Sequence, residues 1–296
     1  MRINTNVNNL IAQEANSNTN NKISSSLEKL STGLRINKAS DDASGLAIAD
    51  KLRTQASSLN QSVKNGNTAV TLVQIMDRAM SEQSYILDQI KQKLIQASNG
   101  TSSTEGIEAV GKDIEKLLNQ VNNIATSISY NGSSLLQQSA GKSDAERDVG
   151  TGLVTFQMGS RAEDTMTLAS GIKSNTAGLD GMSALRLSAA GWSAGLDSAA
   201  GMQSAARVHL ASVDSALNTL NAWRSDVGST QNQLESGIRN LMTQVTNTRA
   251  AESVIRDVDY AQESANFNKH NIISQAGTYA ISQANSQPMS VISLLQ

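Results

Sequence analysis

Apolar seams at helical spacing constrain the fold of this chain more than any other feature. In the first stretch the apolar residues recur at steps of three and four, with one shift of a residue near its middle. They are Ala49, Leu52, Ala56, Leu59, Val63, Gly66, Val70, Val73, Met76, Met80, Leu87, Ile90 and Leu94. A helix of about 50 residues at about 1.5 Å per residue is on the order of 75 Å long. Asn99-Gly100 is a typical helix end, so we expect the helix to stop there.

Two further stretches carry the same spacing. The second runs through Ile107, Val110, Ile114, Leu117, Val121, Ile124 and Ile128 and ends at Asn131-Gly132. The third runs through Val213, Leu217, Leu220, Val227, Leu234, Ile238, Leu241 and Val245. The chain has a single proline, which permits long uninterrupted helices. Because a narrow apolar stripe needs partner helices, the sequence predicts a mostly α fold, a long coiled-coil-like bundle that forms a rod.

The region between the second and third seams has a different pattern. Apolar and polar residues alternate on either side of the polar turn "GSRAED", which indicates a small β-hairpin near 150–168. Residues 171–205 are rich in Gly, Ala and Ser and show little amphipathic order. We expect this stretch to be a surface-exposed connection between helices.

Composition excludes several classes of partner. The net charge is −2, from 24 basic and 26 acidic residues spread along the chain, so no basic stripe is available for nucleic acid. Nowhere do about 18 apolar residues run together, so we expect no membrane insertion. Aromatic residues make up only 3% of the chain, which is typical of a long, narrow core.

The residues that usually carry chemistry are sparse. There is no cysteine, and the two histidines, His209 and His270, have no neighbouring ligand at metal spacing. No phosphate-binding, hydrolase or metalloprotease motif occurs in the required context. We therefore predict no enzyme activity, no metal and no cofactor.

The two ends of the chain are unusual for a soluble protein. The first 21 residues contain eight Asn and no apolar run of the length found in a secretory signal. The last eight residues carry five apolar side chains, although termini fray unless something holds them. Either this tail folds back on the chain or a partner covers it.

Both ends resemble one protein family. The stretch "SLEKLSTGLRINKASDDASGLAIADKLR" at 26–53 is similar to the N-terminal region of bacterial flagellins, and "AAESVIRDVDYAQESANFNKHNIISQAGTYAISQANSQPMSVISLLQ" at 250–296 is similar to their C-terminal region. "ASNGT" at 97–101 and "YNG" at 130–132 match as well. The chain resembles a short flagellin without large outer variable domains, and the resemblance implies a subunit that polymerises into the flagellar filament for swimming.

The resemblance implies a specific architecture. Residues 1–42 and 251–296 would pair as terminal helices lining an inner tube, and 43–250 would form an outer rod. The residues expected in inner-tube contacts are Leu27, Leu30, Leu34, Ile272, Tyr279, Met289, Val291, Ile292, Leu294 and Leu295. Asp41, Asp42 and Arg53 are expected between the tiers or between subunits, where ion pairs fix register more than they supply affinity.

The resemblance also implies partners. These are further copies of the chain in a helical homopolymer, an export chaperone at the C-terminus, the flagellar export apparatus, and the filament cap and hook-filament junction proteins. The protein would then be extracellular, exported without a cleaved signal peptide. A hook-filament junction protein is the main alternative, because that class is similar to flagellin at both ends. A chemoreceptor-like coiled coil would require transmembrane segments.

One departure from the family bears on immune recognition. Flagellins recognised by the Toll-like flagellin receptor carry Arg, Glu and Leu on the first outer helix, where this chain has Gln89, Gln92 and Lys93. Asp113 retains an acidic group on the second helix. Loss of a bidentate Arg and of an apolar contact weakens a desolvated interface, so we expect weak receptor activation.

Overall fold

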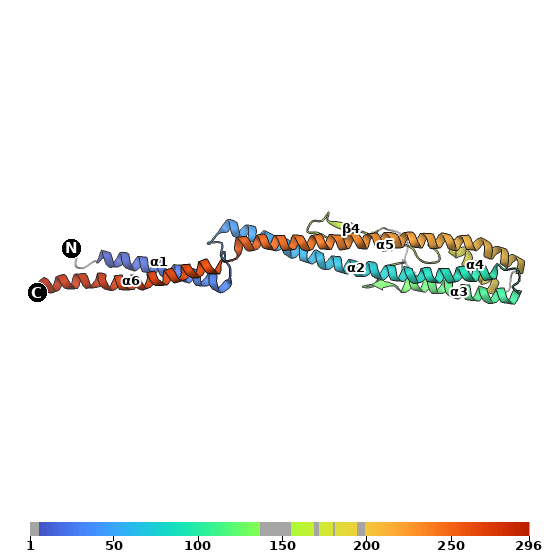
Figure 1. Cartoon of the computed structure of the whole chain (residues 1–296), viewed down its shortest axis with the longest axis horizontal. Helices are drawn as coiled ribbons and strands as arrows, with labels where there is room; N and C mark the ends of the chain where they lie inside the picture. The colour runs from blue at the N-terminus through green and yellow to red at the C-terminus, as the bar shows by residue number, and fades with distance from the viewer. Residues whose placement is uncertain (1–5, 137–154, 169–171, 180, 194–198, 296) are drawn as a thin grey trace. The chain divides into compact units, whose positions relative to one another are not determined.

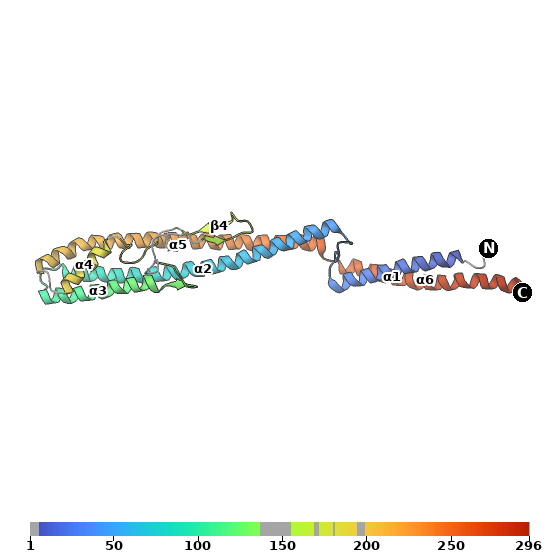
Figure 2. The ribbon, with the colours of Figure 1, turned by 180° about the vertical axis from the view of Figure 1, so that it is seen from behind.

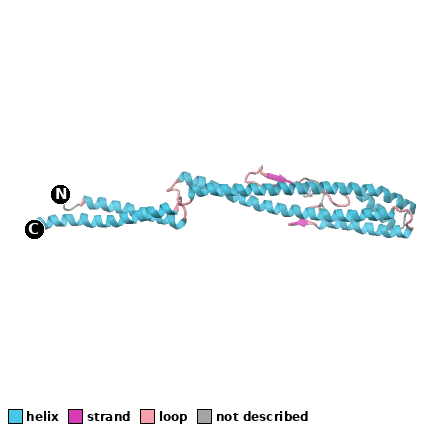
Figure 3. Ribbon diagram, viewed as in Figure 1, coloured by secondary structure: helices cyan, strands magenta, loops and turns pink. Residues whose placement is uncertain are grey.

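The computed structural model describes residues 6–136, 155–168, 172–179, 181–193 and 199–295 (Figure 1). For Ser133, Ser193, Ala199 and 287–295 the description is of the backbone alone. Helices account for most of the described chain, as Figure 3 shows by colour. They are α1 (Val7–Thr32), α2 (Ala43–Ala97), α3 (Thr104–Ser127), α4 (Met182–Ser193), α5 (Ala199–Arg256) and α6 (Tyr260–Leu295). The predicted mostly α fold is confirmed.

The chain packs as two units. Residues 1–57 and 244–296 make up the first, called the terminal unit here, and residues 58–243 make up the second, the central unit. Helices α2 and α5 contribute residues to both units. In the terminal unit α1 lies beside α6, and in the central unit α2, α3 and α5 lie side by side, as the two opposite views show (Figures 1 and 2).

Helix ends follow local capping chemistry. The Asn6 side chain accepts a hydrogen bond from the backbone N–H of Asn9 and starts α1, and Ser103 accepts one from Gly106 and starts α3. Gly33 ends α1 in the left-handed region, with φ 74°, and its N–H bonds back to the Lys29 carbonyl. Each of these residues satisfies helix-end groups that would otherwise lack a partner.

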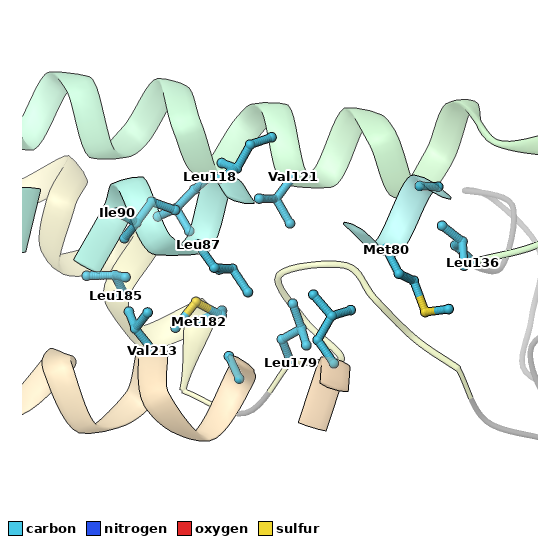
Figure 4. Packing of buried hydrophobic residues seen from close by; sticks show 14 of the residues in the cluster. Met80, Leu87, Ile90, Leu118, Val121, Leu136, Leu179, Met182, Leu185 and Val213 are labelled. Atoms are coloured by element: carbon cyan, nitrogen blue, oxygen red, sulfur yellow. The ribbon is translucent and has the colours of Figure 1, made fainter. Parts of the chain in front are cut away.

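The central unit holds the hydrophobic core (Figure 4). Leu87 and Ile90 of α2, Leu118 and Val121 of α3, and Val213 of α5 are all fully buried and belong to one cluster. At about 1.5 to 3 kcal/mol for each fully buried aliphatic side chain, this cluster is the main source of stability. The predicted seams on α2, α3 and α5 therefore face one another.

The buried face of α3 departs from the predicted seam in its second half. Ile107, Val110, Ile114 and Val121 are buried as the spacing predicted. Leu118 and Ala125 are buried where the spacing had placed Leu117 and Ile124, which pack partly buried against the core. A straight α-helix has 3.6 residues per turn, so it drifts by about 20° per heptad from a 3.5-residue repeat. The drift moves the buried stripe by one residue.

The expectation of a surface-exposed connection at 171–205 is wrong for the described part of that range. Helix α4 packs there against α3 and buries Met182, Leu185, Ala189 and Trp192, each at 0% exposure. The residues around them are mostly Ala, Ser and Gly. Met182, Leu185 and Trp192 are therefore the large side chains that anchor the segment. The small residues let the helices approach closely.

Two antiparallel hairpins complete the central unit. The predicted one joins β3 (Thr155–Gln157) to β4 (Thr165–Thr167), with Phe156 opposite Met166; residues 150–154 of the expected range lie outside the described chain. The second joins β1 (Ser129–Tyr130) to β2 (Ser133–Ser134). Its turn residues Asn131 and Gly132 both have positive φ, 50° and 81°, as a tight two-residue hairpin turn requires. Helix α3 ends at Ser127, before the Asn131-Gly132 pair that was predicted as its end, and the pair turns the hairpin instead.

Candidate assembly surface on the terminal helices

The terminal helices pair through small and polar residues. The Ser274 hydroxyl lies 3.1 Å from Asn20 Oδ1 and 3.4 Å from Asn16 Oδ1, and the Asn6 side chain donates to the Ala284 carbonyl at 2.8 Å. On α1, Ser26 is the one buried residue among those described. The contact between α1 and α6 therefore contains almost no apolar core.

Most large apolar side chains of these helices are exposed instead. The exposed set on α1 and α6 consists of Val7, Leu10, Ile11, Leu27, Tyr260, Ile272, Ile273 and Tyr279. Ile272 and Tyr279 are 66% and 75% exposed. A monomeric protein seldom presents so many large apolar groups on one slender element, and such surfaces mark sites of association.

This surface contains three of the five predicted inner-tube residues whose side chains the structure describes. Leu27, Ile272 and Tyr279 are exposed, and Leu30 and Leu34 are half-buried. The backbones of Met289, Val291, Ile292, Leu294 and Leu295 continue α6, and their side chains lie outside the described part of the chain. Two helices that expose their large apolar groups bury too little to offset about 1 to 2 kcal/mol of backbone entropy per residue. The hairpin needs further helices packed on it.

Where α1 ends and α6 begins, the two chain segments hydrogen-bond to each other. The Arg35 N–H donates to the Arg256 carbonyl at 2.6 Å, and the Val258 N–H donates to the Gly33 carbonyl at 3.0 Å. Leu34 and Asp257 form an antiparallel bridge between these bonds. The ascending and descending segments of the terminal unit are thus tied at one point.

The predicted inter-tier residues all have partners within the chain. One carboxylate oxygen of Asp41 accepts from the N–H groups of Asn37 and Lys38, both at 3.0 Å, and these bonds hold the pKa of Asp41 below its usual range. Asp42 accepts from the Gly45 N–H at 2.8 Å and caps α2. Arg53 pairs with Asp50 at 3.0 Å, one helical turn away.

Sequence reasoning missed the long-range members of this region. Asp50 also lies 3.8 Å from Arg256, whose side chain is only 16% exposed, and the Arg35 guanidinium donates to the Ile255 carbonyl at 2.6 Å. These contacts join residues more than 200 positions apart. The signal available in the sequence was opposite charge, as for Asp50 and Arg256. Opposite charge does not identify which residues pair.

The four residues predicted to alter immune recognition lie on α2 and α3. Lys93 and Asp113 form an ion pair between the two helices at 2.8 Å, and the hydrogen bond from Lys93 lowers the pKa of Asp113. Gln89 is half-buried and Gln92 is exposed. The Lys93 side chain is therefore engaged by the second helix.

Chemical sites are not apparent in the described chain. Within the described residues no group of three or more His, Asp and Glu side chains could hold a metal ion. Of the helices that are described, none is long and apolar enough to cross a membrane. The surface most distinctive for function is the apolar one on α1 and α6.

Comparison with known proteins agrees with this geometry. Residues 3–141 match the bacterial flagellin N-terminal helical region, and residues 210–295 match the bacterial flagellin C-terminal helical region. The chain is 33% identical over 296 residues to flagellin FlaB1 of Treponema pallidum, and the match covers 100% of both chains. The chain belongs to the flagellin family. A second relative, the flagellin of Bacillus subtilis, is 35% identical over 309 residues with both chains fully covered.

Filament core proteins and a related fold are also similar to this flagellin. The flagellar filament 33 kDa core protein of Treponema phagedenis is 32% identical over 296 residues, with both chains fully covered. A structure described as a flagellar hook-associated protein of Vibrio parahaemolyticus has a TM-score of 0.62 and 11% identity, and the match covers 73% of this flagellin and 99% of that chain. At that identity the similarity concerns the fold alone. Membership of the flagellin family indicates a structural protein.

Proposed function

We infer that this flagellin is a structural subunit that polymerises into the bacterial flagellar filament, which lies outside the cell. The observation that carries the inference is the exposed apolar set on α1 and α6, on helices that fully bury no large apolar side chain among those described. Copies of the chain supply the missing apolar partners. A head-to-tail contact that does not close into a ring propagates as a helical polymer.

The assembly is divided between the two parts of the chain. Residues 1–42 and 251–296 line the inner tube, and residues 43–250 form the outer rod. Burial of Leu27, Ile272 and Tyr279 by neighbouring subunits supplies affinity at roughly 25 cal/mol per Å² of apolar surface. The last turns of α6, with Met289, Val291, Ile292, Leu294 and Leu295, extend the same surface.

The charged residues near the start of α2 have a different role. Asp41 and Asp42 hold the connection into α2 by hydrogen bonds to backbone N–H groups, and Arg53 pairs with Asp50 on the helix surface. Exposed ion pairs contribute about 0 to 1 kcal/mol each. These residues therefore set the register of contacts between tiers or subunits, while apolar burial supplies the affinity.

The other partners follow from the state of the chain before assembly. The apolar surface of α6 needs a cover in the cytoplasm, and an export chaperone bound at the C-terminus provides it. The chain passes through the flagellar export apparatus without a cleaved signal peptide. Filament cap and hook-filament junction proteins then contact the two ends of the polymer.

We also propose that the Toll-like flagellin receptor binds this flagellin weakly. Gln89 and Gln92 lack the charge that the family presents at the matching positions, and Lys93 is paired with Asp113. A receptor side chain that contacts this surface would meet an ion pair where the family offers an apolar group. Desolvating that pair costs free energy.

Charge placed within the exposed apolar set tests the assembly proposal. Ile272→Glu and Tyr279→Glu should prevent sedimentable filaments from forming, because a carboxylate cannot be buried between subunits without a partner. Leu187→Glu is the matched control, since Leu187 is 73% exposed on α4 of the central unit. Helical circular dichroism should remain in all three variants. Filaments from Ile272→Glu as long as those from the unchanged protein would contradict the proposal.

A further inference from the structure

The β3–β4 hairpin docks on the helices through a methionine placed between two glycines. A Cβ atom built on Gly66 of α2 would lie 3.1 Å from the Met158 methyl carbon, and one built on Gly237 of α5 would lie 3.2 Å from it. The methyl group therefore occupies the space that side chains at these two positions would fill. Ile238 lies beside the same space, because its Cγ1 would be 2.8 Å from the Cβ atom built on Gly66.

Phe156 and Met166 of the hairpin also pack against the core, and two hydrogen bonds join the hairpin to α2. The Ser62 hydroxyl donates to the Gly159 carbonyl at 3.2 Å, and the Asn65 side chain donates to the Gln157 carbonyl at 3.5 Å, which is long for a hydrogen bond. Both bonds lie next to Met158 in the chain. Met158 is therefore one of three half-buried apolar side chains that dock the hairpin, and the one that fills the space between the two glycines.

Solvent reaches the edge of this contact. A recess of about 380 Å³ lies between α2 and the hairpin, lined by residues that include Ser62, Asn65, Gln157, Gly159 and Arg161. The two chain neighbours of Met158 line it, and Met158 itself is half-buried. Because Met158 is only half-buried, a small oxidant can reach its side chain without unfolding of the central unit.

We propose that Met158 is an oxidation site whose conversion by a peroxide releases the β3–β4 hairpin from α2 and α5. The Sδ lone pair attacks one peroxide oxygen, an S–O bond forms and the O–O bond breaks. The sulfur is oxidised by two electrons to the sulfoxide, and hydrogen peroxide is reduced to water. This conversion makes a flexible apolar side chain polar and chiral.

The product does not suit its site. A sulfoxide oxygen is a strong hydrogen-bond acceptor, and burying such a group without a donor is unfavourable. The Ile238 side chain offers only carbon-bound hydrogens, and the N–H groups of Gly66 and Gly237 lie inside α2 and α5, where backbone hydrogen bonds use them. The oxidised side chain leaves the space between the glycines for water, and the hairpin leaves with it.

The remaining methionines whose side chains the structure describes fall into three groups. Met76, Met80, Met182 and Met202 are at most 2% exposed and are protected by the core. Met242, on the outer face of α5, is 56% exposed and should react first. Because its oxygen can face water, Met242 sulfoxide should leave the hairpin in place, and Met242→Leu is the natural control. Met166 of β4, opposite Phe156, is half-buried and packs against the same core; Met166→Leu is therefore treated with peroxide beside the other variants and should behave as the unchanged protein does.

The test measures oxidation and docking together on the full-length protein. Hydrogen peroxide is added to the unchanged protein, to Met158→Leu and to Met242→Leu, and peptide masses report the oxygen gained at each methionine. Trypsin cleavage after Arg161, an exposed residue in the hairpin turn, reports undocking. We expect cleavage to rise several-fold with Met158 sulfoxide in the unchanged protein and in Met242→Leu, and to stay constant in Met158→Leu.

Two further arms separate oxidation from general damage. Met158→Gln, which carries a polar acceptor of similar length, should show fast cleavage without peroxide. Methionine sulfoxide reductase with a thiol reductant should return the oxidised protein to slow cleavage. Met158 that stays reduced while Met242 is fully converted would overturn the proposal, and so would Met158 sulfoxide with cleavage at Arg161 unchanged.

Discussion

The indole of Trp192 and the imidazole of His209 meet edge to face, with their ring centroids 6.5 Å apart. Trp192 lies on α4 and His209 on α5, and both side chains are buried. His209 Nε2 is 2.9 Å from the Ser188 hydroxyl of α4. This pair of contacts fastens α4 to the long helix, in a segment whose composition is mostly Ala, Ser and Gly.

The pair makes the central unit sensitive to acid. Burial lowers the pKa of His209 below its usual 6.5, so the unfolded chain takes up a proton at a higher pH than the folded chain does. Stability should be constant above pH 6.5 and fall as the pH drops toward the folded pKa. Thermal unfolding followed by Trp fluorescence between pH 8 and 5 measures it. His209→Gln should flatten this fall, whereas an equal fall in that variant would assign it to other groups; His270→Gln is the control.

Two glycines of the long helices should respond to alanine in opposite directions. A Cβ on Gly66 would lie 2.8 Å from Ile238 Cγ1, whereas one on Gly228 would meet nothing within 4 Å. Gly66→Ala should destabilise the protein by about 1 to 3 kcal/mol through overpacking. Gly228→Ala should stabilise it by roughly 0.5 to 1 kcal/mol through helix propensity. Urea unfolding followed by circular dichroism checks both, and similar midpoints for the two variants would show that α2 and α5 are not closely packed at Gly66.

The start of α2 should depend on the Asp42 cap. Asp42→Ala removes the acceptor of the Gly45 N–H and should cost about 0.5 to 2 kcal/mol of local stability. Asp42→Asn keeps an acceptor and should behave nearly as the unchanged protein does. Amide hydrogen exchange at Gly45 and Leu46 is the measurement. Equal protection in the Ala and Asn variants would mean that the cap does not stabilise this helix end.

Receptor activation should rise when the family residues are restored. The variant Gln89→Arg, Gln92→Glu, Lys93→Leu replaces the polar surface by a bidentate cation, an acidic group and an apolar contact. It also removes the Lys93–Asp113 ion pair, at a stability cost of about 0 to 1 kcal/mol for an exposed pair. A cell reporter assay with monomeric protein compares the two. Equal potency would show that these positions do not govern recognition of this chain.

Removal of residues 289–296 should separate assembly from folding. The central unit contains none of these residues, so its thermal unfolding should not change. Filament growth should stop, because the apolar end of α6 is lost from the subunit contact. Electron microscopy after salt-induced polymerisation is the readout, and long filaments from the truncated chain would contradict the prediction.

Periodicity predicted the long helices α2, α3 and α5, since a seam that repeats over many turns leaves few alternatives, whereas the pairing of α1 with α6 was implied by the family resemblance. It did not predict helix α4. Trp192 is fully buried there because α3 and α5 supply its surroundings, and a stretch of Ala, Ser and Gly carries no sign of neighbours so distant in sequence. The assembly surface was predictable where an apolar residue such as Ile272 falls on a terminal helix. The polar contacts between α1 and α6, such as Ser274 with Asn20, depend on how the two helices align along each other. The sequence alone does not reveal that alignment.

The hydrogen bond between Asn6 and Ala284 joins residues 278 positions apart, and this separation affects the order in which contacts form during folding. Closing a loop of that length costs about 5 kcal/mol of chain entropy by its logarithmic dependence on length. Contacts of such long range form after local ones. During synthesis, α1 emerges first and its partner helix last, so the N-terminal helix waits for the whole chain. The delay keeps the two ends of the chain apart until synthesis is complete.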